Sequence, residues 1–162
     1  MKEVKRVGKW NEAGIKDVKL LPLKVNVDER GYLIEILRMD WGVMERFAQV
    51  YIVGNFARGV IRAFHKHEKL WDYFFISHGS AKFMLIDDRE DSPTYLHLDR
   101  FVLSERNPYL LVVPPGVYHG WMSLEDDTQM ISVASELYNY EKPDEVRIDP
   151  YTFGDLWTVK GR

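Results

Sequence analysis

The chain has 162 residues, of which 46% are hydrophobic and 29% are charged, and its formal net charge is −3. This balance is typical of one globular domain and gives no electrostatic basis for nucleic-acid binding. The sequence contains no cysteine, which excludes disulfides, thiolate catalysis and zinc-finger sites. The basic N-terminal segment lacks the apolar core of a secretory signal, and no apolar run could span a membrane. We therefore expect a cytoplasmic protein that binds neither nucleic acid nor membrane.

Short apolar runs separated by turn residues predict a series of strands. In chain order they cover residues 31–37, 49–56, 59–67, 72–79, 81–88, 94–103, 109–116 and 129–138. Between the first two runs, residues 40–49 favour a short helix with Asp40 as its N-cap. Many short strands at regular spacing indicate an all-β barrel or sandwich with short peripheral helical segments.

The predicted strands also suggest how the chain is organised. We expect a single domain over residues 1–162, with an N-terminal arm over 1–27 and the barrel over 28–138. Residues 139–162 are expected to pack on the barrel, and Phe153, Leu156 and Trp157 are the anchors.

The run "VIRAFHKH" places two histidines one residue apart. Strand alternation puts His65 and His67 on one face among small and apolar residues, and Arg62, Phe64 and Lys66 on the other. A single interior histidine is most often a core residue with satisfied hydrogen bonds. Two on one interior face need several polar partners, because a buried unpaired imidazole is costly, and they therefore predict a site.

The spacing of two motifs is more specific than the histidine pair. The segments 59–79 and "PPGVYH" (114–119) resemble the two signature motifs of the cupin superfamily, with Asp72 where a glutamate is usual. The resemblance implies a double-stranded β-helix, or jelly roll, with the pocket inside. In metal-binding cupins the matching residues hold one divalent transition-metal ion, for which imidazole and carboxylate are suitable ligands. The matching residues here are His65, His67, Asp72 and His119.

A longer, ordered set of blocks spans residues 28–157. "DERGYLIEILR", "RGVIRAFH", "DDREDSPTY", "VPPGVYHGW" and "ELYNYEKPDEVRIDPYTFGDLW" together resemble the dTDP-4-dehydrorhamnose 3,5-epimerase family. This family is a metal-independent branch of the cupins that acts on nucleotide-linked 4-keto-6-deoxy sugars. The resemblance implies an isomerase without a cofactor, in deoxysugar or polysaccharide biosynthesis. It also implies a homodimer whose subunits exchange N-terminal segments.

Carried over residue by residue, the resemblance implies a role for each catalytic group. His65 would be the general base that removes the proton next to the 4-keto group. Lys69 would stabilise the enolate oxygen, which needs a nearby cation. His119 and His67 would be further polar groups of the catalytic pocket.

The resemblance also implies contacts to the substrate. Arg30 would reach the nucleotide diphosphate from the neighbouring subunit, a task that suits the guanidinium fork. Arg62 would contact sugar or phosphate. Further substrate contacts are expected from Gln49, Tyr51 and Tyr138.

Three features depart from the family pattern. One is His67, where the epimerases commonly show a residue other than histidine. The catalytic tyrosine of the family falls near Ser132, and the candidate replacements are Tyr51, Tyr118, Tyr138 and Tyr140. The family's late aspartate, which orients the base, lies in a segment after the tryptophan, but this chain ends five residues after Trp157. Asp149 and Asp155 are poor substitutes for it.

Four alternatives to 3,5-epimerisation remain open. A base without its acid suits epimerisation at one carbon. The "R-x-x-H-x-H" run of residues 62–67 is similar to the dTDP-sugar 3,4-ketoisomerases, in which a histidine pair moves protons between neighbouring carbons. A metal-dependent cupin enzyme and a non-catalytic sugar-binding cupin also remain open.

Overall fold

The structure, a computed structural model, describes residues 2–161. Within this range the chain forms short strands and one 3-10 turn. In chain order these are β1 (Arg6–Trp10), β2 (Lys19–Pro22), β3 (Val25–Asp28), β4 (Gly31–Ile34), η1 (Met39–Trp41), β5 (Gln49–Asn55), β6 (Ile61–Lys66), β7 (Asp72–His78), β8 (Ser80–Asp87), β9 (His97–Ser104), β10 (Tyr109–Val113), β11 (Val117–Ser123), β12 (Thr128–Ala134) and β13 (Val146–Arg147).

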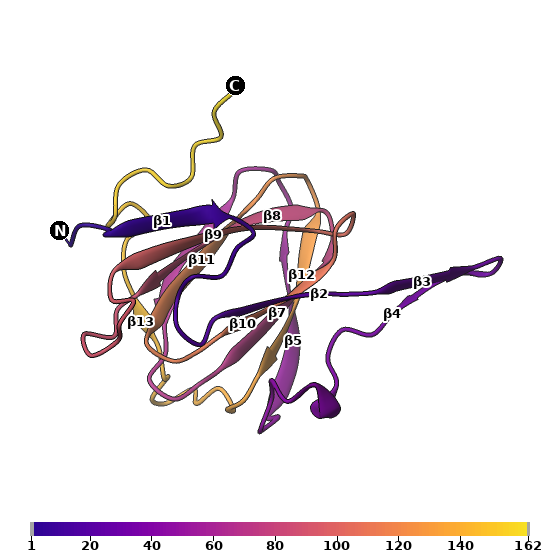
Figure 1. Cartoon of the computed structure of the whole chain (residues 1–162), viewed down its shortest axis with the longest axis horizontal. Helices are drawn as coiled ribbons and strands as arrows, with labels where there is room; N and C mark the ends of the chain where they lie inside the picture. Colours follow the sequence, from indigo (N-terminus) through magenta and orange to yellow (C-terminus); the bar gives the residue numbers. More distant parts are fainter. Residues whose placement is uncertain (1, 162) are drawn as a thin grey trace.

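The strands build two packed sheets and a separate hairpin (Figure 1). The larger sheet has the order β1-β9-β8-β11-β6-β13, and the smaller has the order β2-β10-β7-β12-β5. Within both sheets neighbouring strands are antiparallel, except that β1 runs parallel to β9. The all-β jelly-roll prediction is therefore confirmed. No helix within residues 2–161 has the length and apolarity that a bilayer span requires.

Apolar side chains pack on both faces of the larger sheet. Phe74 of β7, Phe83 of β8 and Trp121 of β11 belong to the core between the two sheets. Successive side chains of a strand point to opposite faces, so Met84 belongs to a second cluster, together with Trp157. Burial on both faces explains why these strands read as continuous apolar runs rather than as alternating ones.

The C-terminal segment covers the outer face of the larger sheet. Trp157 is only 1% exposed and packs beside Phe64, with 5.5 Å between the ring centroids. Phe153 and Leu156 are partly buried in the same cluster. Lys82 donates a hydrogen bond of 2.6 Å to the Trp157 carbonyl oxygen, which fixes the segment to β8. The three expected anchors therefore all contact the barrel.

The N-terminal residues are built into the sheets and do not form a separate arm. β1 pairs with β9 in the larger sheet, and β2 pairs with β10 in the smaller one. The expected boundary between residues 27 and 28 falls inside β3, which pairs with β4. The β3–β4 hairpin, in contrast, extends away from both sheets (Figure 1). The sequence expectation differs because "RVGKW" and "KLLP" are short edge strands whose pairing partners lie far along the chain.

The helix expected over residues 40–49 is replaced by the turn η1. Its N-cap position is occupied by Arg38, whereas Asp40 lies inside the turn and pairs with Arg38 at 2.7 Å. Gly42 adopts a left-handed conformation with φ of 70° and ends the turn. Trp41 and Met44 then pack on the outer face of the smaller sheet, and this packing holds the segment irregular.

A β-bulge interrupts the pairing of β6 with β11. His65 lies opposite His119 and Arg62 opposite Trp121, so three steps along β6 match two along β11. The extra residue shifts the alternation of β6. The two strands also approach closely here, because Gly120 has no side chain between them.

We expect Gly120→Ala to lower the free energy of unfolding by about 1–3 kcal/mol, the usual cost of forcing atoms into a packed interior. A Cβ atom at residue 120 would overlap the side chain of Ala63 and would lie 3.0 Å from the Arg62 carbonyl oxygen. Urea denaturation measures the effect. Gly54→Ala is the matched control, because its Cβ would come no closer than 3.8 Å to Thr128. Equal losses for the two variants would contradict the close-approach explanation.

Candidate active site

A pocket of about 420 Å³ opens between the two sheets, a volume in the usual range for small-molecule sites. Its apolar lining comes from Phe74, Trp121 and Met130. Its polar lining is a concentrated group of ionisable side chains, namely His65, His67, Asp72, His119 and Glu145. The histidines come from β6, from the residue after it and from β11, so both sequence motifs deliver side chains to one place.

His65 pairs with a carboxylate from the C-terminal segment. His65 Nδ1 donates a hydrogen bond of 2.6 Å to Glu145 Oε1. Glu145 Oε2 accepts a second bond, of 2.9 Å, from Arg147 Nε. Burial opposes ionisation of Glu145, but the bonds from His65 and Arg147 outweigh it and hold the pKa of this carboxyl below its usual value. The carboxylate fixes the ring and leaves His65 Nε2 as the nitrogen that can accept a proton.

The pairing of β13 with β6 explains this contact. Arg147 lies opposite His65 in the strand register, and Glu145 precedes β13 by one residue. Glu145 is a pocket residue that the sequence prediction missed. Asp149 and Asp155, the substitutes considered there, instead accept backbone hydrogen bonds from Tyr151 and Trp157 within the C-terminal segment.

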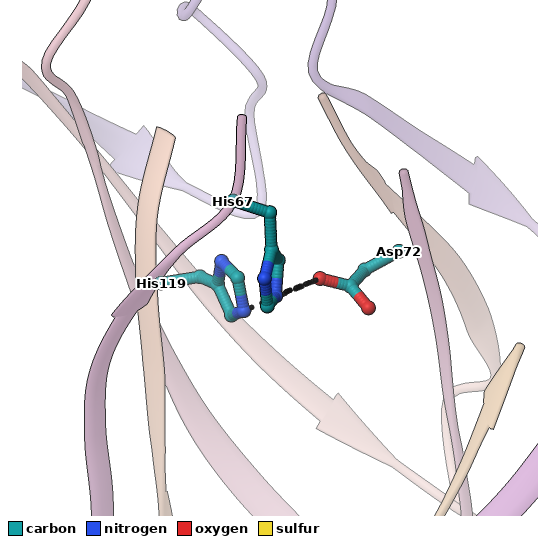
Figure 2. A group of neighbouring side chains, drawn as sticks. All are labelled: His67, Asp72 and His119. Atoms are coloured by element: carbon teal, nitrogen blue, oxygen red, sulfur yellow. Dashed lines mark ion pairs between the residues drawn. The ribbon is translucent and has the colours of Figure 1, made fainter. Parts of the chain in front are cut away.

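A second group joins His67, Asp72 and His119. Figure 2 shows the two imidazole rings and the carboxylate converging from different segments of the chain. Asp72 Oδ2 lies 3.1 Å from His67 Nε2 and 3.3 Å from His119 Nε2. The opposite ring nitrogens are held by backbone carbonyls, because His67 Nδ1 donates to Asp144 at 2.5 Å and His119 Nδ1 to Val117 at 3.2 Å. We call these three residues the His67–Asp72–His119 cluster.

The two histidines of the cluster differ in their tendency to hold a proton. Burial lowers the pKa of His67, but the Asp72 carboxylate and the Asp144 carbonyl outweigh this effect and raise the pKa to about 9. Burial dominates at His119 and lowers its pKa to about 4. In the metal-free protein the proton of the cluster therefore lies on His67 at neutral pH.

The structure brings together three of the four residues expected as metal ligands. One ligand atom from each member of the cluster lies within 4.8 Å of the others, but His65 is not part of this group. Its Nδ1 is bound to Glu145, and its ring centroid lies 6.2 Å from that of His119. Two imidazoles and a carboxylate suit a divalent transition metal.

Arg62 lies on the same side of β6 as His65, not on the opposite face as strand alternation predicted. It lines the pocket with the histidines, whereas Phe64 is buried in the outer cluster. The β-bulge between Arg62 and His65 is the cause, because it shifts the alternation by one residue. Arg62 Nε donates a bond of 2.7 Å to the Asn55 side chain, which directs the guanidinium along the pocket.

Two expected site residues lie elsewhere in the chain. Lys69 lines a different cavity, on the outer face of the smaller sheet beside Trp71 and Tyr73. The turn that carries it is fixed by Asp144, whose side chain accepts the backbone N–H of Lys69 at 3.0 Å. Arg30 lies at the tip of the β3–β4 hairpin, paired with Asp28 and largely exposed.

The remaining expected contacts surround a second hollow, of about 330 Å³, that adjoins the pocket. Gln49 and Tyr138 line it, and Gln49 Oε1 accepts the Tyr138 backbone N–H at 2.8 Å. Tyr51, His67, Glu145 and Arg147 line both spaces. The two hollows therefore share part of their walls, and the first is rich in histidine and the second in tyrosine.

Among the four candidate tyrosines, Tyr51 is the one that lines the pocket of the ionisable groups. It stands opposite Ser132 in the pairing of β5 with β12, and burial together with the Asp72 charge raises its pKa. Ser132 itself is fully buried. Tyr118 packs against Phe153 on the outer face of the larger sheet. Tyr138 and Tyr140 line the second hollow but not the histidine-rich pocket.

Comparison with known proteins gives consistent results. The model of the dTDP-4-dehydrorhamnose 3,5-epimerase family matches residues 12–160. The chain is 40% identical to the probable low-salt glycan biosynthesis epimerase Agl13 of Haloferax volcanii, over 85% of this chain and 88% of the relative. It is 39% identical to the spore coat polysaccharide biosynthesis protein SpsL of Bacillus subtilis, over 91% and 99%. The solved dTDP-4-dehydrorhamnose 3,5-epimerase of Sulfolobus tokodaii superposes with a TM-score of 0.79 at 27% identity, over 92% and 85%.

Proposed function

Since the chain belongs to the dTDP-4-dehydrorhamnose 3,5-epimerase family, we propose that it epimerises a dTDP-4-keto-6-deoxy sugar by moving a proton next to the carbonyl. The observation that carries this proposal is the His65–Glu145 pair at 2.6 Å in a pocket between the sheets. The pair has the geometry of a general base and the carboxylate that orients it.

In the proposed reaction, His65 Nε2 takes the proton from the carbon next to the ketone. The Glu145 carboxylate stabilises the imidazolium that forms and keeps the ring in place. Negative charge develops on the ketone oxygen, which therefore requires a positive group nearby. Arg62 and the protonated His67 line the same pocket, and either side chain could supply this positive charge.

Inversion at the carbon requires a proton donor on the opposite face of the sugar. We assign this role to Tyr51, because it lines the pocket and lies across the strand pair from Ser132, where the family tyrosine is expected. Tyr51 would approach the sugar from β5, whereas a tyrosine at residue 132 would approach it from β12. Both proton transfers then use side chains alone and need no redox cofactor.

The second hollow suits the nucleotide part of the substrate. Tyr138 and Tyr140 pack edge to face with 5.0 Å between ring centroids and offer aromatic surface to a base. Arg147 lies where the two hollows meet and can bind phosphate through its guanidinium. The named functions of the two similar relatives, glycan and spore coat polysaccharide biosynthesis, support a role in polysaccharide biosynthesis. A cytoplasmic location, expected from the cysteine-free sequence, is part of the same proposal.

The β3–β4 hairpin supports the expected homodimer. The hairpin pairs with neither of the two sheets, and its side chains Val27, Tyr32 and Leu33 are each at least 59% exposed. An isolated two-stranded hairpin is marginal in water unless its apolar side chains are covered. A second copy of the chain would cover them and would also bring Arg30, at the hairpin tip, toward a neighbouring pocket.

We expect the double substitution Tyr32→Asp and Leu33→Asp to convert the dimer to a monomer, because it places two charges in the apolar contact. Light scattering coupled to gel filtration measures the mass. Val159→Asp is the matched control, since Val159 is 56% exposed but lies in the C-terminal segment. A wild-type protein that is already monomeric at micromolar concentration would contradict the dimer proposal.

The direct test of the proposed function is solvent exchange. Incubation of the protein in D₂O with a dTDP-4-keto-6-deoxy sugar is expected to introduce deuterium at C3, at C5 or at both, as measured by mass spectrometry and NMR. The carbon that gains deuterium separates single-site from double-site epimerisation. Saturable binding without exchange would instead favour a sugar-binding protein, and migration of the carbonyl would favour a ketoisomerase.

A further inference from the structure

We propose that His67, Asp72 and His119 bind one divalent transition-metal ion, with His65 outside the ligand set. This three-residue site differs from the four-ligand arrangement expected from the cupin motifs. It also differs from a purely metal-free pocket, because the base and the ion would lie side by side.

The distances among the ligand atoms fit a metal centre. Asp72 Oδ2 lies 3.1 Å from His67 Nε2 and 3.3 Å from His119 Nε2. Two ligands that are each about 2.1 Å from a zinc ion are separated by about 3.0 Å at a right angle and by about 3.4 Å at the tetrahedral angle. Asp72 lies in β7, His119 in β11 and His67 directly after β6, so three separate segments of the sheet framework hold the ligand atoms at this spacing (Figure 2).

The second nitrogen of each ring is already committed. His67 Nδ1 and His119 Nδ1 both donate to backbone carbonyls, those of Asp144 and Val117. In the neutral form of each ring this arrangement fixes the tautomer in which Nε2 carries the lone pair, and outer hydrogen bonds of this kind orient metal-binding histidines in proteins. Binding of an ion would displace the proton that His67 holds in the metal-free protein.

The carboxylate of the cluster lacks a hydrogen bond of its own. Asp72 is 2% exposed, and within the described range 2–161 its Oδ2 atom has only the two imidazole contacts, neither of which is a regular hydrogen bond. A buried carboxylate oxygen without a partner is costly. A proton on His67 would compensate it but would leave the His119 Nε2 lone pair facing an anion. A metal ion among the three atoms satisfies both nitrogens and the oxygen at once.

The cluster lines the same pocket as His65, so ligand positions beyond the three side chains would face the pocket. Three protein ligands with an open position are typical of catalytic rather than structural metal sites. If the proposed function holds, an ion here would supply the positive charge that the enolate oxygen needs. Lys69, the residue expected to do so, lines a different cavity.

The test is Zn²⁺ binding to the metal-stripped full-length protein, measured by isothermal titration calorimetry. We expect one ion per chain in the wild type, and affinity at least about 100-fold weaker in His67→Gln and in Asp72→Asn, because each removes one of three ligands. His65→Gln is the matched control: it changes a neighbouring pocket histidine and is expected to shift the affinity by less than about threefold. His78→Gln, at an exposed histidine paired with Glu105, controls for surface binding.

A wild-type measurement covers the case in which a ligand variant does not fold. Addition of Zn²⁺ is expected to shift the ¹⁵N resonances of the His67 and His119 side chains and to leave the Nδ1–H of His65 bound to Glu145. No saturable binding to the folded wild type would overturn the proposal, and so would an equal loss of affinity in His65→Gln and His67→Gln. These measurements use no nucleotide sugar. Failure of metal binding therefore leaves the exchange test of the proposed function unaffected, and absence of exchange leaves the metal site standing.

Discussion

Replacing His65 with glutamine is expected to lower the rate of solvent deuterium incorporation by about 10²–10⁴-fold, the usual contribution of a positioned general base. Glutamine keeps roughly the size of the imidazole and can still bond to Glu145, so the pocket remains filled. It cannot accept the substrate proton at neutral pH. The measurement is the initial rate of deuterium uptake into a dTDP-4-keto-6-deoxy sugar, with far-UV circular dichroism and the melting temperature as checks on folding.

His78→Gln is the control for this experiment, because His78 is an exposed histidine at the far end of β7. It is expected to leave both the exchange rate and the melting temperature unchanged. If His65→Gln exchanges deuterium at the wild-type rate, the base must be another residue, and the assignment of the His65–Glu145 pair fails with it.

Replacing Glu145 with glutamine is expected to lower the same rate by about 10²-fold. The substitution preserves the shape of the side chain but removes the charge that stabilises the imidazolium. Glu145→Asp retains the charge on a shorter side chain and is expected to recover part of the rate. The ¹⁵N spectrum of the His65 ring gives a second readout, because loss of the carboxylate frees the ring to adopt its other tautomer.

Glu141→Gln is the matched control for the charge at residue 145. Glu141 is exposed in the same segment, and its backbone N–H bonds to Asn139. A purely structural role for Glu145 would appear as a lower melting temperature with an unchanged ring spectrum and rate. An unchanged rate in Glu145→Gln alongside an inactive His65→Gln would show that His65 acts without this carboxylate.

Much of the barrel could be predicted because its strands carry their own signals. The run 72–79 and the run 81–88 are apolar and bounded by turn residues, and the structure has β7 and β8 at these places. β11 was not predicted as a strand of its own. All seven of its residues are buried, so it shows no alternation, and Gly120 in its middle is unusual in a strand. Only its packing between β6 and β8 explains why it is extended.

The candidate site could be predicted only in part, for reasons that lie outside each local segment. The spacing of the motifs brought attention to His65, His67 and His119, which line one pocket. The side of β6 on which Arg62 lies depends on a bulge defined by the partner strand, and no residue of β6 signals it.

Glu145 could not be identified because it lies 80 residues from His65, in a charged segment without periodicity. The pairing of β13 with β6 alone brings the two together. Lys69 illustrates the reverse case. Its position near the histidines in sequence suggests a contact, but three backbone N–H groups of its turn bind Asp144 and fix the turn with the lysine toward another cavity.

The contact between residues 65 and 145 has a consequence for synthesis on the ribosome. A chain is made from its N-terminus at about 5–20 residues per second, so β6 emerges several seconds before Glu145 does. Until β13 is added at the edge of the larger sheet, the emerging protein has its histidines but no carboxylate to orient the base. Under the proposed roles of His65 and Glu145, competence for proton transfer is thus acquired in one of the last events of biogenesis. Enzymatic activity in a nascent-chain preparation should therefore report completed folding and not merely formation of the early strands.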